Sequence, residues 1–282
     1  MRVVMCRPDF FDVKRRSQTN RRMNPESPPH RVLAIRQWDQ LLMNYREHGL
    51  RVIVMDGQPD LHDMTFVANA GLPVRGHFIL SNFLEKERKG ETGHYREFFG
   101  KLYGYDKVIS LSEKAIFEGQ GDALFINDVT LLLGYGVRTN EQGVREVVDL
   151  ISKIDPKIKV IPLCFHPLDY YKPDEELFYH LDTCLLYLKK FNVFLACTRT
   201  FTKEAIEELA KIGRIFWLRN TEAHKYLCNS VVIGDAIFTP YIDEYTWNSL
   251  SHNFGYHVVM NDMSEFLKSG GAVKCLTLEI YD

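Results

Sequence analysis

Hydrophobic and polar positions alternate along the chain with two different periods. Apolar, β-branched runs predict strands, and the stretches between them carry apolar residues every three to four positions, which predicts helices. Predicted strands cover residues 2–6, 51–55, 77–82, 108–111, 159–165 and 192–197. Predicted helices cover residues 32–47, 95–103, 141–154 and 203–212, with a shorter one near 244–253. The repeated switch of period indicates mixed layers of α and β structure.

Tight turns join some of the predicted strands into hairpins. In DALFINDVTLLLGYG the pair Asn127-Asp128 separates two apolar runs, which is a hairpin signal. HLDTCLLYLKKFNVFLAC has the same pattern, with Lys189-Lys190 near the turn. Hairpin, helix and strand recur at intervals of about 40 to 60 residues. The pattern predicts one domain, residues 1–282, built from about five ββαβ-like units around a centre.

Composition excludes several classes of protein. Hydrophobic residues make up 45% of the chain, charged residues 26%, and the net charge is −2, so neither nucleic acid nor a membrane is expected as partner. No apolar run reaches the roughly 18 residues of a membrane span. Six scattered cysteines without a CxxC pair indicate neither a disulfide framework nor a zinc ribbon, and fit a cytoplasmic protein. The basic pairs Arg15-Arg16 and Arg21-Arg22 are interpreted as a solvated loop.

Polar residues interrupt the apolar pattern in two segments of the first half. In HDMTFVANAGL, Asp63 and Asn69 bracket an apolar pair, either as caps of a turn or as part of a site. In FEGQGDALF, Glu118 and Asp122 flank two glycines just before an apolar strand. Glycines let the backbone pass close to another group, and two acids attract a cation and repel an anion. This segment is therefore not interpreted as a phosphate loop.

Two further interruptions follow. In FYHLDTCLLYL, a strand would direct His180 and Asp182 to the same face, either as a satisfied pair or as a base with a neighbouring carboxylate. In GYGVRTNEQGVRE, Arg138 lies between a strand and a helix whose predicted N-cap is Asn140. An arginine there either binds a carboxylate bidentately or is an exposed loop charge.

Near the C-terminus, GGAVKCLTLEIYD contains a lone cysteine, Cys275, in a run of small residues interpreted as a strand. A thiol and an imidazole can form a nucleophile and its acid/base partner. Surplus carboxylates do not suit a protease, which needs donors around an oxyanion, but they suit a positively charged reacting carbon. A guanidinium is such a group, since it is planar, always cationic and gripped pairwise by carboxylates.

Five short motifs in order then resemble the guanidine-modifying superfamily: DMTFVANAG, FEGQGDALF, the RTN of YGVRTNEQG, HLDT and GGAVKCLTLEI. This superfamily comprises arginine deiminases, dimethylarginine dimethylaminohydrolases, arginine dihydrolases and amidinotransferases. The resemblance runs from DFFDV near residue 9 to the C-terminus. It implies the five-bladed α/β-propeller called the pentein fold. It also implies a small-molecule substrate, arginine or a derivative, and no metal or organic cofactor; the oligomeric state stays open, with a homo-oligomer as one option.

The resemblance also implies roles for individual residues. Cys275 matches the nucleophile, His180 the acid/base, and Glu118 the glutamate that grips the guanidinium and orients the histidine. The implied substrate-binding residues are Asp63, Asn69, Asp182, Arg138, Arg88 in ERKGE and an asparagine of the N-terminal segment.

Two segments depart from parts of the superfamily. After DMTFV, methylarginine hydrolases and deiminases carry acidic residues, whereas this chain has Ala68-Asn69, as in the arginine dihydrolase and amidinotransferase-like branch. An amide there is hypothesised to tolerate the neutral ureido group of citrulline and permit a second hydrolysis. In SQTNRRMNPES about two extra residues leave Asn20 and Asn24 as alternatives for the substrate-binding asparagine.

Three rival hypotheses remain at this stage. An amidinotransferase would use an amine in place of water as the second acceptor. A metal hydrolase would need His180, Asp182, His166 and Glu118 to converge, although no HExxH-type spacing is present. A catalytically inactive arginine-binding module would bind without turnover.

Overall fold

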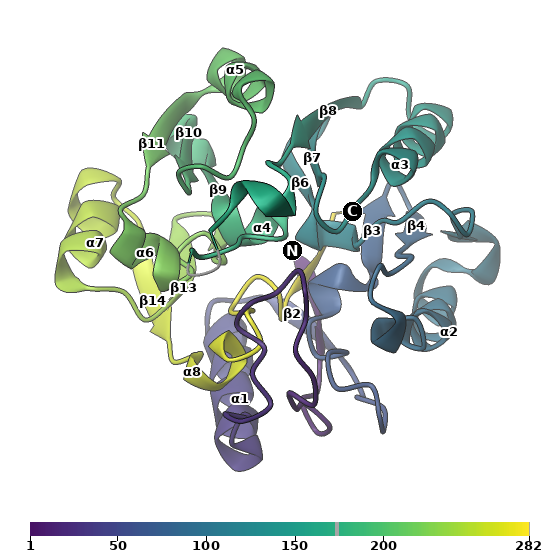
Figure 1. Cartoon of the computed structure of the whole chain (residues 1–282), viewed down its shortest axis with the longest axis horizontal. Helices are drawn as coiled ribbons and strands as arrows, with labels where there is room; N and C mark the ends of the chain where they lie inside the picture. The colour runs from purple at the N-terminus through teal and green to yellow at the C-terminus, as the bar shows by residue number, and fades with distance from the viewer. Residues whose placement is uncertain (173–174, 282) are drawn as a thin grey trace.

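Five three-stranded sheets surround a centre in the computed structural model, which describes residues 1–172 and 175–281 (Figure 1). In each sheet the middle strand pairs antiparallel with one neighbour and parallel with the other. We call the antiparallel neighbour the entry strand of the unit; the five entry strands are β3, β6, β9, β12 and β15. Residues from all five line one central cavity, so these strands form the inner wall of the ring.

Four units follow one another along the chain. The first two comprise β3 (Gly71–Val74), β4 (His77–Leu80), α2 (Glu91–Tyr103), β5 (Val108–Ile109), then β6 (Ala123–Asn127), β7 (Thr130–Tyr135), α3 (Glu141–Ile154), β8 (Lys159–Cys164). The next two comprise β9 (Leu185–Leu188), β10 (Val193–Ala196), α5 (Lys203–Ile212), β11 (Arg214–Trp217), then β12 (Val231–Ile233), β13 (Ala236–Pro240), α7 (Glu244–Asn248), β14 (His257–Asn261). The ββαβ pattern predicted from the sequence is confirmed.

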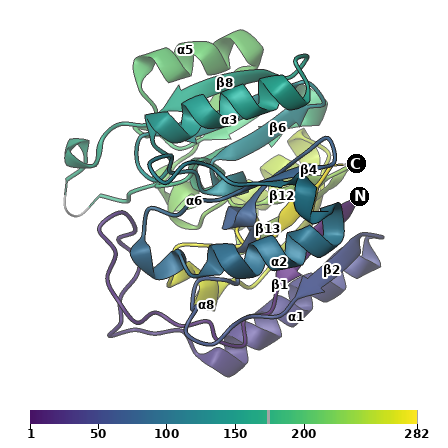
Figure 2. The ribbon, with the colours of Figure 1, turned by 90° about the vertical axis from the view of Figure 1, so that its right-hand side faces the viewer.

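The remaining unit is assembled from both ends of the chain. Its entry strand β15 (Leu278–Ile280) pairs antiparallel with β1 (Arg2–Cys6), which pairs parallel with β2 (Arg51–Met55) after α1 (Arg31–Glu47). The ring is therefore closed by main-chain hydrogen bonds between the two ends. The segment of residues 7–30 crosses one side of the ring, which we call the front, and both termini lie on the rear (Figure 2).

Local sequence explains the best-predicted elements. The Asn140 side chain accepts a hydrogen bond from Gly143 N at 2.7 Å and so caps α3, as predicted, a contact of about 1 kcal/mol. Val144, Val147 and Ile151, three and four positions apart, are buried in the core that α3 shares with β6 and β7. The same spacing buries Trp38 of α1 completely. These apolar faces fix each helix against the outside of its sheet.

Three local predictions are wrong. α2 begins at Glu91 instead of residue 95, because its first turn is polar and lacks an apolar period. His180 and Asp182 do not lie on a strand: His180 precedes the short helix α4 (Leu181–Cys184). Cys275 lies in a turn ahead of β15, not in a strand. Short helices α6 (Asn220–His224) and α8 (Ser264–Leu267) also escape prediction because they span little more than one turn.

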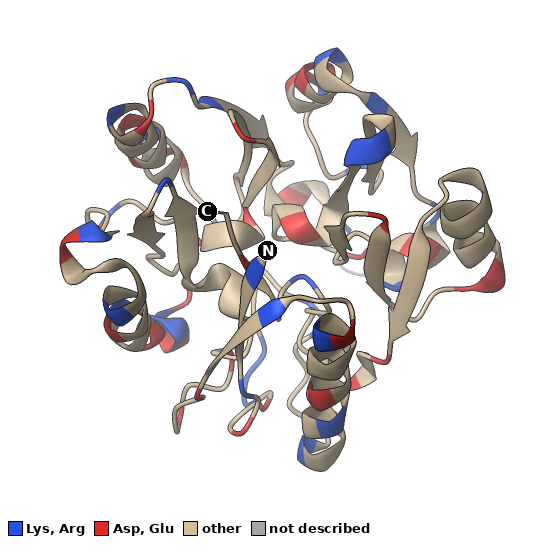
Figure 3. Cartoon of the chain, turned by 180° about the vertical axis from the view of Figure 1, so that it is seen from behind, with Lys and Arg blue, Asp and Glu red and all other residues tan. Residues whose placement is uncertain are grey.

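Charged residues are interspersed over the molecule. Seen from behind, Lys and Arg alternate with Asp and Glu along the outer helices, without a face of one sign (Figure 3). No helix in the described part of the chain is long and apolar enough to cross a membrane.

Candidate active site

A polar residue stands two to five positions ahead of every entry strand, and these five residues meet at the centre of the ring. They are Asn69, Glu118, His180, Asn229 and Cys275, before β3, β6, β9, β12 and β15 respectively. Each is at most 2% exposed. Burial of five polar side chains is unfavourable unless they pair with one another or with a ligand. The fold thus builds one polar centre from five units that are far apart in the sequence.

The Cys275 thiol is held between an acid and an amide. Its Sγ donates a hydrogen bond to Asp182 Oδ2 at 3.2 Å and accepts one from Asn229 Nδ2 at 3.1 Å. Asn229 Oδ1 also accepts from the backbone N–H groups of Ala272 (2.9 Å) and Cys275 (3.1 Å), which fixes the turn. Burial and the neighbouring Asp182 raise the pKa of the Cys275 thiol well above its usual value, against the lowering effect of the Asn229 hydrogen bond. Without a ligand the sulfur is therefore a buried, protonated thiol.

Glu118 orients His180. Glu118 Oε2 contacts His180 Nε2 at 2.8 Å and Arg138 Nη1 at 3.0 Å, and Oε1 accepts from Leu84 N at 3.1 Å. Burial alone would raise the Glu118 pKa, but the Arg138 charge and the His180 hydrogen bond outweigh it and hold that pKa well below its usual range. An ionised carboxylate can only accept, so the proton of the imidazole lies on Nε2. The other nitrogen, Nδ1, is buried and has no partner among the described residues.

Two aspartates flank this pair. Burial raises the pKa of Asp182 to about 7 in spite of the Cys275 hydrogen bond and the nearby Lys274 charge. Its second oxygen, Oδ1, is buried without a partner in the described part of the chain. Asp122 instead accepts from Thr139 Oγ1 (2.6 Å) and Leu181 N (3.1 Å), and burial raises its pKa to about 6. The unpaired His180 Nδ1 and Asp182 Oδ1 are the two positions that could meet a ligand.

The glycines of the EGQGD segment make this packing possible. Gly119 has φ +60, and a Cβ there would lie 2.7 Å from Gly71 N. A Cβ on Gly121 would lie 2.2 Å from Asn69 Nδ2 and 3.2 Å from the His180 ring. The glycines therefore serve close approach of two units, as interpreted from the sequence, and not an anion.

Guanidinium side chains converge on the other end of the site. Arg88 forms a bidentate pair with Glu91 (2.8 Å for each contact) and donates to Asn69 Oδ1 at 2.9 Å. Arg138 donates to Thr19 Oγ1 at 2.6 Å and pairs with Glu118. Both are buried and line a front cavity of about 20 Å³ that also borders Cys275. Arg138 is thus not an exposed loop charge.

The front segment contributes further residues. Asn20 is buried in the cavity wall and donates to Tyr179 Oη (3.2 Å) and Ser269 O (2.8 Å). Asn24, in contrast, accepts from Glu26 N in a local turn, so the geometry favours Asn20 as the site asparagine. Arg15 reaches Asp63 Oδ2 at 3.6 Å, so this half of the basic patch is not the solvated loop that was expected.

The residues selected from the sequence are therefore gathered in two groups. The first group consists of two contacting pairs, Glu118 with His180 and Asp182 with Cys275. The second group, Asp63, Asn20, Arg88 and Arg138, lines the front cavity. Asn69 also lines that cavity and links the groups, since it donates to Glu118 O and accepts from Arg88. In the described part of the chain the Asp63 side chain makes no contact with the first group. It accepts a hydrogen bond from Ser269 Oγ at 3.3 Å and pairs with Arg15.

Sequence reasoning missed Asn229 and Arg15. The signal for Asn229 was its place in CNSVV, an amide directly ahead of an apolar strand, as Glu118 and His180 are ahead of theirs. His166, one of the four residues of the metal-centre hypothesis, stacks on Tyr170 and does not line the front cavity. No cluster of three or more His, Cys, Asp or Glu side chains suited to a metal occurs in residues 1–172 and 175–281.

Comparison with known proteins agrees with this geometry. Protein ZK1307.1 of Caenorhabditis elegans is 34% identical over 249 residues, which cover 88% of this chain and 83% of that protein. The bifunctional arginine dihydrolase/ornithine cyclodeaminase AgrE of Nostoc is 31% identical over 99% of this chain, which spans only 38% of AgrE. A crystal structure of the product-bound N-terminal domain of ArgZ, an arginine dihydrolase from cyanobacteria, has 28% identity and a TM-score of 0.87 over 100% of this chain and 97% of that one.

The family assignment follows from a match over almost the whole chain. Residues 7–282 match the family described as N,N dimethylarginine dimethylhydrolase, eukaryotic. This match contains every site residue described above and agrees with the five-unit ring. The chain belongs to this dimethylarginine dimethylhydrolase family and, with it, to the guanidine-modifying superfamily of pentein fold.

Proposed function

We propose that this chain is a cysteine-dependent hydrolase of the guanidinium group of free arginine, of the dihydrolase type that continues from citrulline to ornithine. The observation that carries the proposal is a buried thiol that donates to Asp182, whose other oxygen is unpaired, together with the unpaired ring nitrogen of His180 two residues earlier in the same segment. The likeness to AgrE and to the ArgZ domain supports arginine as substrate. Residues 1–282 would form one catalytic domain.

Binding follows from the two groups of side chains. An amino acid substrate carries a carboxylate that suits Arg88 and Arg138, and an ammonium that suits Asp63. These charges now pair with protein groups such as Glu91, Glu118 and Arg15, so substrate entry must exchange partners. The guanidinium would then lie between Glu118 and Asp182. Its positive charge lowers the pKa of the Cys275 thiol and produces the thiolate when substrate is present.

The chemical steps then use three side chains. The thiol proton of Cys275 passes to His180 Nδ1, and Sγ forms a bond to the guanidinium carbon. The carbon–nitrogen bond to the leaving nitrogen then breaks as His180 Nδ1 transfers that proton to it. The covalent thiouronium intermediate is attacked by water, which His180 deprotonates. The carbon–sulfur bond breaks and citrulline remains, with ammonia released. A second passage with water converts citrulline to ornithine, ammonia and carbon dioxide.

Asn69 supports the second hydrolysis. Its amide donates to Glu118 O at 3.3 Å and accepts from Arg88 at 2.9 Å, so at this position the site holds a neutral dipole where an acid would add charge. A neutral position binds the uncharged ureido group of citrulline with a smaller electrostatic disadvantage than an acid does.

The test is incubation of the enzyme with arginine, citrulline or dimethylarginine, with products identified by mass spectrometry. We expect arginine and citrulline both to yield ornithine and ammonia. Parallel reactions with added glycine address the amidinotransferase alternative, in which a new guanidino compound replaces ammonia. The Cys275→Ala variant is the control, and ornithine formation at the same rate by that variant contradicts the proposal.

A further inference from the structure

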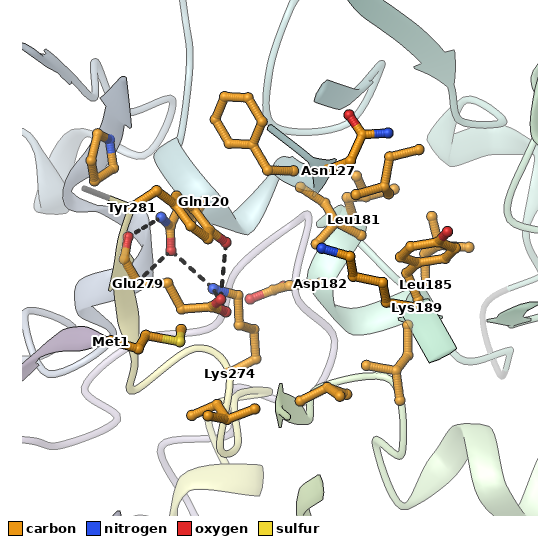
Figure 4. Close-up of a pocket in the computed structure, with 18 of the residues that line it drawn as sticks. Met1, Gln120, Asn127, Leu181, Asp182, Leu185, Lys189, Lys274, Glu279 and Tyr281 are labelled. Atoms are coloured by element: carbon orange, nitrogen blue, oxygen red, sulfur yellow. Dashed lines mark hydrogen bonds and ion pairs between the residues drawn. The ribbon is translucent and has the colours of Figure 1, made fainter. Parts of the chain in front are cut away.

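A second cavity of about 390 Å³ lies on the side of the ring that carries both termini, since Met1 and Tyr281 belong to its lining (Figure 4). Its walls come from all five entry strands, with aliphatic side chains such as Leu124, Leu186 and Val232. Three polar side chains, Gln120, Lys274 and Glu279, stand at its inner end beside Asp182 (Figure 4). The front cavity, in contrast, has about 20 Å³, room for a single water molecule.

Asp182 joins this rear cavity to the nucleophile. It belongs to the wall of the rear cavity, and its Oδ2 accepts the Cys275 hydrogen bond at 3.2 Å. Cys275 in turn borders the front cavity. The second oxygen of Asp182, Oδ1, is buried without a partner among the described residues, so a small polar molecule that reached it would meet an unused acceptor. The hydrogen bond from Cys275 to Asp182 thus joins the linings of the two cavities.

The polar group at the inner end is internally satisfied. Lys274 Nζ donates to Gln120 Oε1 at 2.9 Å and pairs with Glu279 Oε1 at 2.8 Å, and Gln120 Nε2 donates to Glu279 O at 2.6 Å. Lys274 is only 6% exposed, so these partners replace the water that its ammonium group loses on burial. A satisfied cluster gives the cavity a fixed polar wall that does not compete for water or ammonia.

Each hydrolysis needs one water to enter and one ammonia to leave. The front is closed over the site by Arg15, Asn20 and Met23 of the 7–30 segment, and an amino acid bound there occupies the remaining space. Opening the front for ammonia would also release citrulline before the second hydrolysis. A separate route for the small molecules avoids that loss.

We propose that the rear cavity is the route by which water reaches the Cys275 adduct and ammonia leaves it while the amino acid stays bound in front. This inference rests on the proposed hydrolysis of arginine. On this route Asp182 Oδ1 is the first acceptor, and Gln120, Lys274 and Glu279 form the polar part of the cavity wall.

The test narrows the rear cavity without altering a catalytic side chain. Leu124 lies on β6 in the cavity wall, and Leu124→Phe and Leu124→Trp add volume stepwise, with the volume-conserving Leu124→Met as a reference. Val232→Trp fills the cavity from β12. The matched control is Val129→Trp, at a 41% exposed position in the β6–β7 turn outside the cavity. Steady-state kcat and KM for arginine, and the mass of acid-quenched enzyme, are measured for each.

We expect kcat to fall with added volume, by roughly tenfold in the Trp variants, and KM to fall with it, so that kcat/KM changes by less than about twofold, because only the steps after adduct formation are slowed. Because water reaches the adduct more slowly, acid-quenched Leu124→Trp enzyme should contain more covalent adduct than the wild type. The Val129→Trp control should match the wild type. Folded Phe and Trp variants with wild-type kcat and no adduct overturn the route. If a Trp variant does not fold, the Phe variant decides. Wild-type enzyme that releases no ammonia from arginine refutes the proposed function instead.

Discussion

The units that begin with β9 and β12 each place a buried polar residue shortly before their entry strand, and the two residues have different roles. His180, ahead of β9, is held through Nε2 by Glu118 and leaves Nδ1 without a partner. Asn229, ahead of β12, is fully engaged: its Nδ2 reaches Cys275 Sγ and Asp182 O, and its Oδ1 accepts two backbone N–H groups. A group with a spare hydrogen-bonding position can act on a ligand, whereas a satisfied group can only order its neighbours.

The largest expected effect is the loss of arginine turnover when the Cys275 sulfur is removed. Cys275→Ala removes the nucleophile, so we expect arginine turnover to fall by more than about 10³-fold and no covalent adduct to form. The residue is buried and small, so the variant should keep the wild-type circular dichroism spectrum. Arginine turnover and intact-protein mass provide the measurement, with Cys228→Ala, another buried cysteine, as control. Residual ammonia release at the wild-type rate would show that the sulfur is not the nucleophile.

Asn229→Ala tests whether Asn229 acts by positioning Cys275 instead of by contacting the substrate. Without the amide the Cys275 turn loses two backbone contacts and the sulfur loses a donor, so we expect kcat to fall by about 10- to 100-fold with little change in KM. Since the Asn229 hydrogen bond lowers the thiol pKa, its loss should move the pH profile of Cys275 alkylation to higher pH.

The control for this variant is Asn261→Ala. Asn261 is also a buried, hydrogen-bonded asparagine, but it lies at the end of β14 and contacts Asn44 and the Thr239 carbonyl. It should lose stability without the shift in the alkylation profile. An alkylation profile of Asn229→Ala that coincides with the wild type contradicts the ordering role.

The contrast between the two units also marks what the sequence could predict. Both predicted ends of α3 agree with the structure, because its cap, Asn140, and its apolar stripe are local signals. The β6–β7 hairpin followed from Asn127-Asp128 for the same reason. The candidate site could be selected because Glu118, His180 and Cys275 stand in short motifs of the superfamily.

Contacts between distant segments could not be predicted. The first residue of α4, Leu181, donates its backbone N–H to Asp122 Oδ1, which is 59 residues away in the chain, and the HLDT sequence alone does not reveal this contact. Asn229 acquires its role only from the turn 46 residues further on. Arg15 carries no motif, and its partners Asp63 and Glu85 lie in another unit.

Asp182 offers a test through stability. Its pKa is raised to about 7, so between its usual range and pH 7 the folded state binds a proton that the unfolded state has lost. Stability from this group is present at low pH and is lost as pH rises toward 7. The amide of Asp182→Asn does not titrate. As pH rises through that window, the free energy of unfolding of the variant should therefore increase relative to the wild type by at most about 1.4 kcal/mol per pH unit. Urea unfolding at pH 4 to 8 measures the difference, and a constant difference across this range contradicts the raised pKa.

The smallest expected effect concerns the amide ahead of β3, which orders its surroundings as Asn229 does but also faces the substrate. Asn69→Asp adds a charge that holds a guanidinium and disfavours the neutral ureido group, so citrulline should accumulate. The ratio of ornithine to citrulline should fall roughly fivefold, the equivalent of one hydrogen bond of about 1 kcal/mol. Asn24→Asp introduces the same charge in the front segment outside the cavity and should leave the ratio unchanged. If both variants keep the wild-type product ratio, the amide is not what permits the second hydrolysis, and Asn69 belongs with Asn229 as an ordering residue alone.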